Sequence, residues 1–117
     1  LTTRKATVAL MRLLKKKGFN LYYLSNISCH ALDILKARSF WTIFDGGVAS
    51  CDVNINKPDP AIYKLLLKNY NLVPQETIFT DDNKDNASNA FEAGITGIQF
   101  KNVKGLCKML VTYGIDI

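Results

Sequence analysis

Apolar residues that recur every three or four positions predict a series of helices. The expected helices cover about residues 3–17, 29–37, 59–70, 84–93 and a last segment around residues 106–113. Gly18 and Gly94 are expected to end two of them, and Asp59-Pro60 is a typical helix start, with Asp as the N-cap. The expected buried faces are Ala6, Leu10, Leu13 and Leu14; Ile62, Leu65, Leu66 and Tyr70; and Leu106, Met109, Leu110 and Tyr113.

Short apolar runs between these helices predict strands at about residues 21–24, 47–50, 77–80 and 97–100. Strands separated by helices of this length indicate βαβ units, a mostly parallel sheet and helices on both of its faces. We therefore expect one α/β domain over residues 1–117. No apolar run approaches the roughly 18 residues of a membrane span, so no membrane partner is expected.

The composition is that of a single globular domain: 117 residues, 48% hydrophobic and 21% charged. The net charge of +5 raises the question of a nucleic-acid partner. The only basic run in the sequence, Lys15-Lys16-Lys17, lies just before Gly18, where the first helix is expected to end. Cations at that place complement the negative end of a helix dipole. No aromatic residue is interleaved with this run, so we expect no nucleic-acid partner. A modestly basic surface also suits a small anionic substrate.

The three cysteines, Cys29, Cys51 and Cys107, are far apart and odd in number. This pattern argues against a disulfide framework and predicts a reducing, cytoplasmic location. Cys29 is adjacent to the single histidine, His30, a spacing that does not suit zinc.

Polar residues end two of the predicted strands, where parallel sheets bind their ligands. Ser25-Asn26 follows the first strand, Asp81-Asp82 follows the third, and Lys57 precedes a helix on the same expected edge. Adjacent carboxylates favour a cation such as Mg²⁺, and a hydroxyl, an amide and a lysine suit phosphoryl oxygens. Taken singly, Ser25-Asn26 is more often a helix cap or turn than a phosphate ligand, and Asp81-Asp82 is as often a helix cap. A lysine such as Lys57 is most often an exposed loop residue.

Three segments together resemble motifs two, three and four of the haloacid dehalogenase-like (HAD) hydrolase superfamily: YYLSN at 22–26, KPDPAIY at 57–63 and IFTDDNKDN at 78–86. The resemblance runs from about residue 4 to residue 100. It is greatest to the branch with a helical cap inserted near the N-terminus, which includes small sugar-phosphate phosphatases. It implies a Rossmann-like parallel three-layer sandwich and a Mg²⁺-dependent phosphatase acting on a small phosphorylated metabolite.

The resemblance also implies a role for each matching residue. Ser25 would hold the transferring phosphoryl group with help from Asn26, and Lys57 would neutralise the nucleophile and the phosphate. Asp81 and Asp82 would hold Mg²⁺, one directly and the other through water or Lys57, and Asn86 would support their loop. The family's dehalogenases lack the paired aspartates and need no metal, so Asp81-Asp82 favours a phosphatase.

The family's first motif, an Asp-x-Asp on the central strand of the sheet, has no match in this sequence, and neither has the cap. The resemblance therefore implies an incomplete core that lacks its nucleophile, and we expect this chain alone to be inactive. A missing N-terminal segment or a second chain would complete the sheet. Two alternative hypotheses remain open: the chain is a non-catalytic HAD-like binding module, or it is a fragment of a haloacid dehalogenase.

Overall fold

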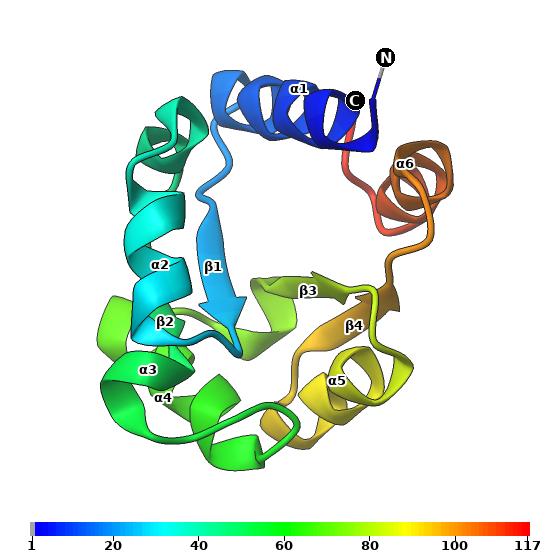
Figure 1. Cartoon of the computed structure of the whole chain (residues 1–117). Coiled ribbons are helices and arrows are strands. Elements are labelled where there is room, and N and C mark those ends of the chain that lie inside the picture. The colour runs from blue at the N-terminus through cyan, green and yellow to red at the C-terminus, as the bar shows by residue number, and fades with distance from the viewer. Residues whose placement is uncertain (1) are drawn as a thin grey trace.

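The computed structural model describes residues 2–117 as helices packed on two pairs of short strands (Figure 1). With η marking 3₁₀ helices, the elements run α1 (Thr3–Lys16), β1 (Tyr22–Ser25), α2 (Cys29–Lys36), η1 (Ser39–Ile43), β2 (Gly46–Ala49), α3 (Ser50–Val53), α4 (Pro60–Tyr70), η2 (Pro74–Glu76), β3 (Ile78–Asp81), α5 (Lys84–Asn89), η3 (Ala90–Ala93), β4 (Thr96–Gln99) and α6 (Val103–Thr112). The predicted alternation of helices and strands is confirmed.

All the strand pairing is parallel. In one pair β1 lies beside β2, with Tyr22 opposite Gly46 and Ser25 opposite Ala49. In the other β3 lies beside β4, from Ile78 opposite Thr96 onward. Within residues 2–117 no ladder of hydrogen bonds joins the two pairs, so each strand has a partner on one edge alone. Figure 1 shows the two pairs lying apart.

Successive residues of β3 contact two different hydrophobic cores. Phe79 packs on the core that includes Leu24 and Val48 of the other pair and Ile62 of α4. Ile78 packs on a second core, which comprises Leu10, Ile98, Leu106 and Leu110 and lies between β4, α1 and α6. Because side chains alternate along a strand, the two faces of β3 contact different cores at Ile78 and Phe79, as in a three-layer α/β arrangement, whereas Thr80 is exposed.

The helix ends follow the local sequence. The Asp59 carboxylate accepts a hydrogen bond from the backbone N–H of Ala61 at 3.0 Å, and Pro60 begins α4, as predicted. Gly18 and Gly94, at the ends of α1 and η3, have φ of 95° and 81°, which favours glycine. Gly97 is needed for another reason: a Cβ there would lie 1.8 Å from the Ala87 carbonyl oxygen, so only glycine lets α5 approach β4.

The prediction that certain apolar residues are buried is wrong for three of them. Leu13 in α1 and Met109 and Tyr113 at the end of the chain are exposed, at 39%, 39% and 49%. The second core takes one narrow stripe from each of α1 and α6, namely Leu10 and Leu14, and Leu106 and Leu110. The predicted strand at 47–50 ends one residue early, because Ser50 begins α3.

The expectation of unpaired cysteines is wrong for two of the three. Cys29 and Cys51 form a disulfide with their Cα atoms 5.2 Å apart, and Cys107 is free. The bridge forms because β1 and β2 are parallel neighbours, so the segments that follow them lie at the same end of the sheet. None of the helices in the described part of the chain is long and apolar enough to cross a bilayer.

Reducing the Cys29–Cys51 bridge should lower the free energy of unfolding by about 3 kcal/mol, since it closes a loop with a sequence separation of 22. Urea unfolding with and without a dithiol reductant measures the difference. Cys107→Ser is the control, because it removes the free thiol and leaves the bridge. Identical midpoints in the two conditions would show that the bridge does not stabilise the fold.

Asp45→Asn should destabilise the fold at neutral pH by less than about 1 kcal/mol. Asp45 pairs with Lys15 at 2.6 Å, and this hydrogen bond, together with the Leu21 N–H, holds the pKa of Asp45 below its ordinary value. A lowered carboxyl pKa stabilises the fold above the unfolded value of about 3.9, and the stabilisation is lost as pH falls through the folded value.

Unfolding midpoints of wild type and Asp45→Asn should therefore converge in acid. Asp33→Asn is the control, because Asp33 is exposed and has no ion pair within the described residues. A gap between wild type and Asp45→Asn that stays constant down to about pH 2 would contradict this assignment.

Candidate active site

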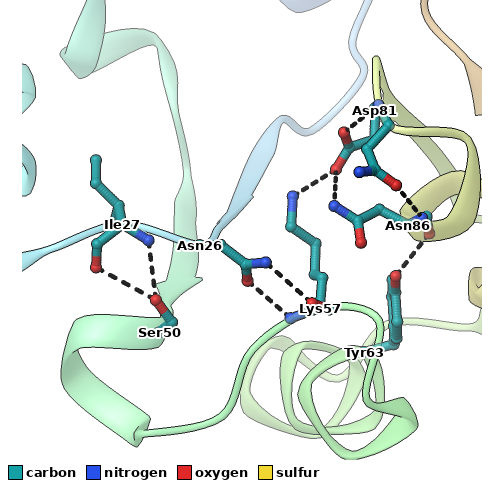
Figure 2. A network of polar contacts seen from close by, with 8 residues as sticks. Asn26, Ile27, Ser50, Lys57, Tyr63, Asp81 and Asn86 are labelled. Carbon is teal, nitrogen blue, oxygen red and sulfur yellow. Dashed lines mark hydrogen bonds and ion pairs between the residues drawn. The ribbon is translucent and has the colours of Figure 1, made fainter.

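The loop after β1 is joined to the loop before α4 through Asn26. The Asn26 side chain accepts a hydrogen bond from the Lys57 backbone N–H at 2.7 Å and donates one to the Lys57 carbonyl at 3.0 Å. Figure 2 shows this two-point contact. It satisfies both backbone groups of Lys57 and leaves the lysine side chain to extend toward β3.

A second contact holds the same loop to β2 and α3. The Ile27 backbone N–H donates to Ser50 Oγ at 2.9 Å, and the Ser50 hydroxyl donates to the Ile27 carbonyl at 3.2 Å (Figure 2). The Cys29–Cys51 bridge lies immediately beyond this contact. The loop after β1 is thus fixed on two sides.

Lys57 and Asp81 form a buried ion pair at the carboxyl end of β3. Lys57 Nζ lies 2.5 Å from Asp81 Oδ2, and both side chains are 9% exposed. The ammonium also lies 5.3 Å from the centre of the Phe79 ring, in a cation–π contact. Since each buried ion costs several kcal/mol to desolvate, this largely buried pair and its close partners make the carboxyl end of β3 a candidate functional site.

The Asp81 carboxylate has further partners within its own loop. Asp81 Oδ1 accepts from the Asn83 backbone N–H at 2.9 Å, and Oδ2 accepts from Asn86 Nδ2 at 3.4 Å. Burial alone would raise the pKa of Asp81, but the hydrogen bonds from Lys57 and Asn83 and the charge of Lys57 outweigh it and hold the pKa below its usual value. Asp81 is therefore ionised at neutral pH.

Asp82 differs from Asp81 in its surroundings. Its side chain is exposed, while its backbone carbonyl accepts from Gln99 Nε2 at 3.3 Å. Within residues 2–117 no group of three or more His, Cys, Asp or Glu side chains could hold a metal ion. Mg²⁺ bound through one or two carboxylates, several waters and a substrate phosphate does not need such a group, and the exposed Asp82 carboxylate fits that role.

The structure brings five of the six predicted site residues into one neighbourhood. Asn26, Lys57, Asp81 and Asn86 form a continuous series of contacts, and Asp82 adjoins Asp81. Ser25, the last residue of β1, lies beside Asn26 and is half-buried, and its side chain has no hydrogen bond to the other five in the described structure.

Two residues of this network were not predicted. Ser50 is 9% exposed and contacts Ile27, and Tyr63 is fully buried and donates from its hydroxyl to the Asn86 carbonyl at 2.6 Å. Tyr63 lies three positions before Leu66 on the buried face of α4, so helical spacing alone could have indicated it. Nothing in the sequence indicates which carbonyl its hydroxyl contacts.

Comparison with known proteins gives the family. A model described as a haloacid dehalogenase-like hydrolase matches residues 1–94. A sesquiterpene phosphatase of Aspergillus oryzae is 32% identical over 103 residues, which cover 87% of this chain and 53% of the relative. A phosphorylated carbohydrates phosphatase of Thermotoga maritima is 37% identical over 68 residues, or 58% of this chain and 32% of the relative. The chain thus spans about half or less of these relatives.

A HAD family enzyme of Bacteroides thetaiotaomicron, solved in complex with magnesium and inorganic phosphate, superposes with a TM-score of 0.74 at 27% identity. The match covers 84% of this chain and 52% of that one. It confirms the predicted fold class, an incomplete Rossmann-like parallel core. With its motifs, its fold and the family model in agreement, the chain belongs to the haloacid dehalogenase-like hydrolases.

Proposed function

We propose that this chain is part of a Mg²⁺-dependent phosphatase that acts on a small phosphorylated metabolite. The observation that carries the proposal is the buried Lys57–Asp81 pair beside the exposed carboxylate of Asp82, at the carboxyl end of β3. One fixed cation and one exposed carboxylate at a strand end suit a phosphate and its metal ion. The phosphatase relatives and the neighbour solved with magnesium and phosphate support the same reaction.

In this proposal, the two aspartates have different roles. Asp81 is engaged by Lys57, Asn83 and Asn86, which leaves its carboxylate few free positions for a ligand. Asp82 is exposed and would hold Mg²⁺ directly, while Asp81 would fix the lysine. When bound, the metal would neutralise charge on the phosphoryl oxygens.

The remaining residues would bind and orient the phosphate. The Lys57 ammonium supplies a positive charge in a place where Asp81 and the Phe79 ring hold it. The Ser25 hydroxyl, which has no hydrogen-bond partner within the described structure, is available to donate to a phosphoryl oxygen. Both polar atoms of the Asn26 side chain are used on Lys57, so Asn26 would assist by holding the loop, as Asn86 would on the aspartate side.

The nucleophile would come from outside the sequence described here. Among residues 2–117 the two strand pairs are not joined, and β1 and β3 each have one edge without a strand partner. A further strand ending in Asp-x-Asp, from a preceding segment or a second chain, would complete the sheet and place an aspartate near Lys57. The family's chemistry is transfer of the phosphoryl group to that aspartate, followed by hydrolysis of the aspartyl phosphate by water.

The cytoplasmic location stays a prediction. A Cys29–Cys51 bridge that persists in the cell would contradict it.

We predict that this chain alone does not hydrolyse p-nitrophenyl phosphate in the presence of Mg²⁺. Fusing an apolar segment that ends in Asp-x-Asp-x-Thr ahead of Thr2 through a flexible linker should produce activity, because the linker keeps the added strand at high effective concentration. The control is the same fusion with its first Asp replaced by Asn. Mg²⁺-dependent turnover by the unfused chain would contradict the external origin of the nucleophile. Binding of phosphate without turnover in the fusion would favour a non-catalytic module.

Asp82→Asn in the active fusion should raise the Mg²⁺ concentration needed for half-maximal rate by roughly tenfold or more, because it removes the charged ligand. Asp85→Asn is the matched control, since Asp85 is an exposed carboxylate three residues away. Equal Mg²⁺ dependence of the two variants would remove the metal role from Asp82. Release of halide from a 2-haloacid without Mg²⁺, in place of phosphate-ester hydrolysis, would instead favour a dehalogenase.

A further inference from the structure

Tyr63 on α4 contacts Asn86 and Phe79, and each of these two residues contacts one member of the Lys57–Asp81 pair. Tyr63 is 0% exposed, and Figure 2 shows its hydroxyl directed toward Asn86. Its hydroxyl and its ring make separate contacts, and each contact leads to one member of the ion pair.

The hydroxyl contact leads to Asp81. Tyr63 Oη donates to the Asn86 carbonyl at 2.6 Å, and Asn86 Nδ2 donates to Asp81 Oδ2 at 3.4 Å. The backbone N–H of Asn86 donates to Asn83 Oδ1 at 3.0 Å, which caps α5. Tyr63 therefore holds the first turn of α5, from which Asn86 reaches the carboxylate.

The ring contact leads to Lys57. The Tyr63 and Phe79 rings meet edge to face, with centroids 5.5 Å apart and planes at 83°. The Lys57 ammonium lies 5.3 Å from the centre of the same Phe79 ring. Tyr63 thus fixes the aromatic surface against which the lysine charge rests.

The tyrosine hydroxyl stays a donor at any physiological pH, because burial raises the pKa of Tyr63 to about 12. A buried hydroxyl without a partner would destabilise the fold, and no buried side-chain polar atom of the described residues lacks one. Phenylalanine would fill nearly the same space without the hydrogen bond to the Asn86 carbonyl.

We propose that Tyr63 is a positioning residue that sets the separation and orientation of the Lys57 ammonium and the Asp81 carboxylate. This inference rests on the proposed function, in which that pair orders the phosphate and metal site. Tyr63 itself touches no reacting atom.

Tyr70→Phe provides a matched control for Tyr63→Phe. Tyr70, also on α4, donates from its hydroxyl to the Gly47 carbonyl at 2.9 Å and accepts from the Gly47 N–H at 2.8 Å. Each variant removes one hydroxyl that is bonded to a backbone carbonyl. Of these two tyrosines, Tyr63 is the one whose contacts lead to the ion pair. A general effect of losing a buried hydroxyl should therefore appear in both variants, whereas an effect on the ion pair should appear in Tyr63→Phe alone.

The test measures the ¹H–¹⁵N signal of the Lys57 side-chain ammonium in the whole chain, assigned by its absence in Lys57→Arg. The close contact with Asp81 should slow exchange with water and make the signal visible in wild type and Tyr70→Phe. In Tyr63→Phe we expect faster exchange or loss of the signal, together with a shift of the Asn86 side-chain amide. Phe79→Leu, which leaves the Tyr63 hydroxyl in place, should weaken the Lys57 signal alone.

The inference would be overturned if the Lys57 signal were unchanged in Tyr63→Phe. It would also be overturned if the signal were lost equally in Tyr70→Phe. In the active fusion, Tyr63→Phe should lower kcat by about tenfold, and Tyr70→Phe should leave it within about twofold. Failure of the proposed function is distinguishable: the fusion would then show no turnover, while the Lys57 signal would still depend on Tyr63.

Discussion

The buried Lys57–Asp81 ion pair is the interaction on which the arrangement of the site depends. It joins the segment before α4 to the end of β3, two parts of the chain that no strand ladder connects. Desolvating both charges is costly, and either charge without the other would be more costly still. The contacts around the pair offset this cost: Asn83 and Asn86 on the carboxylate, the Phe79 ring on the ammonium, and Asn26 on the lysine backbone.

The same pair explains how a sheet in two parts can still hold one site. Asn26 and Ser50 directly follow β1 and β2, whereas Asp81 is the last residue of β3. Helix α4 packs against both pairs of strands through a single core. Packing on α4 sets the distance between the halves, and the ion pair and the Asn26 contact set the alignment of their carboxyl ends.

Much of this could be predicted from the sequence, because local rules determine it. Apolar spacing gives the helices and strands, Asp59-Pro60 gives the start of α4, and polar residues at strand ends indicate the site. Contacts that depend on side-chain torsions and on tertiary packing could not be predicted. The Asn26 contact with the Lys57 backbone, the Tyr63 contact with Asn86 and the Cys29–Cys51 bridge join residues 22 to 31 positions apart, and no local pattern specifies such pairs.

The pleat of β3 accounts for the unequal roles of the two aspartates. Phe79 and Asp81 are two residues apart, so their side chains leave the strand on the same face, the one covered by α4. Lys57 approaches from the segment that precedes α4 and therefore meets the ring and the carboxylate together. Asp82 follows the last residue of the strand, where the chain turns toward α5, and its carboxylate faces solvent. A one-residue shift of the motif along the strand would exchange these environments, exposing the lysine's partner and burying the free carboxylate.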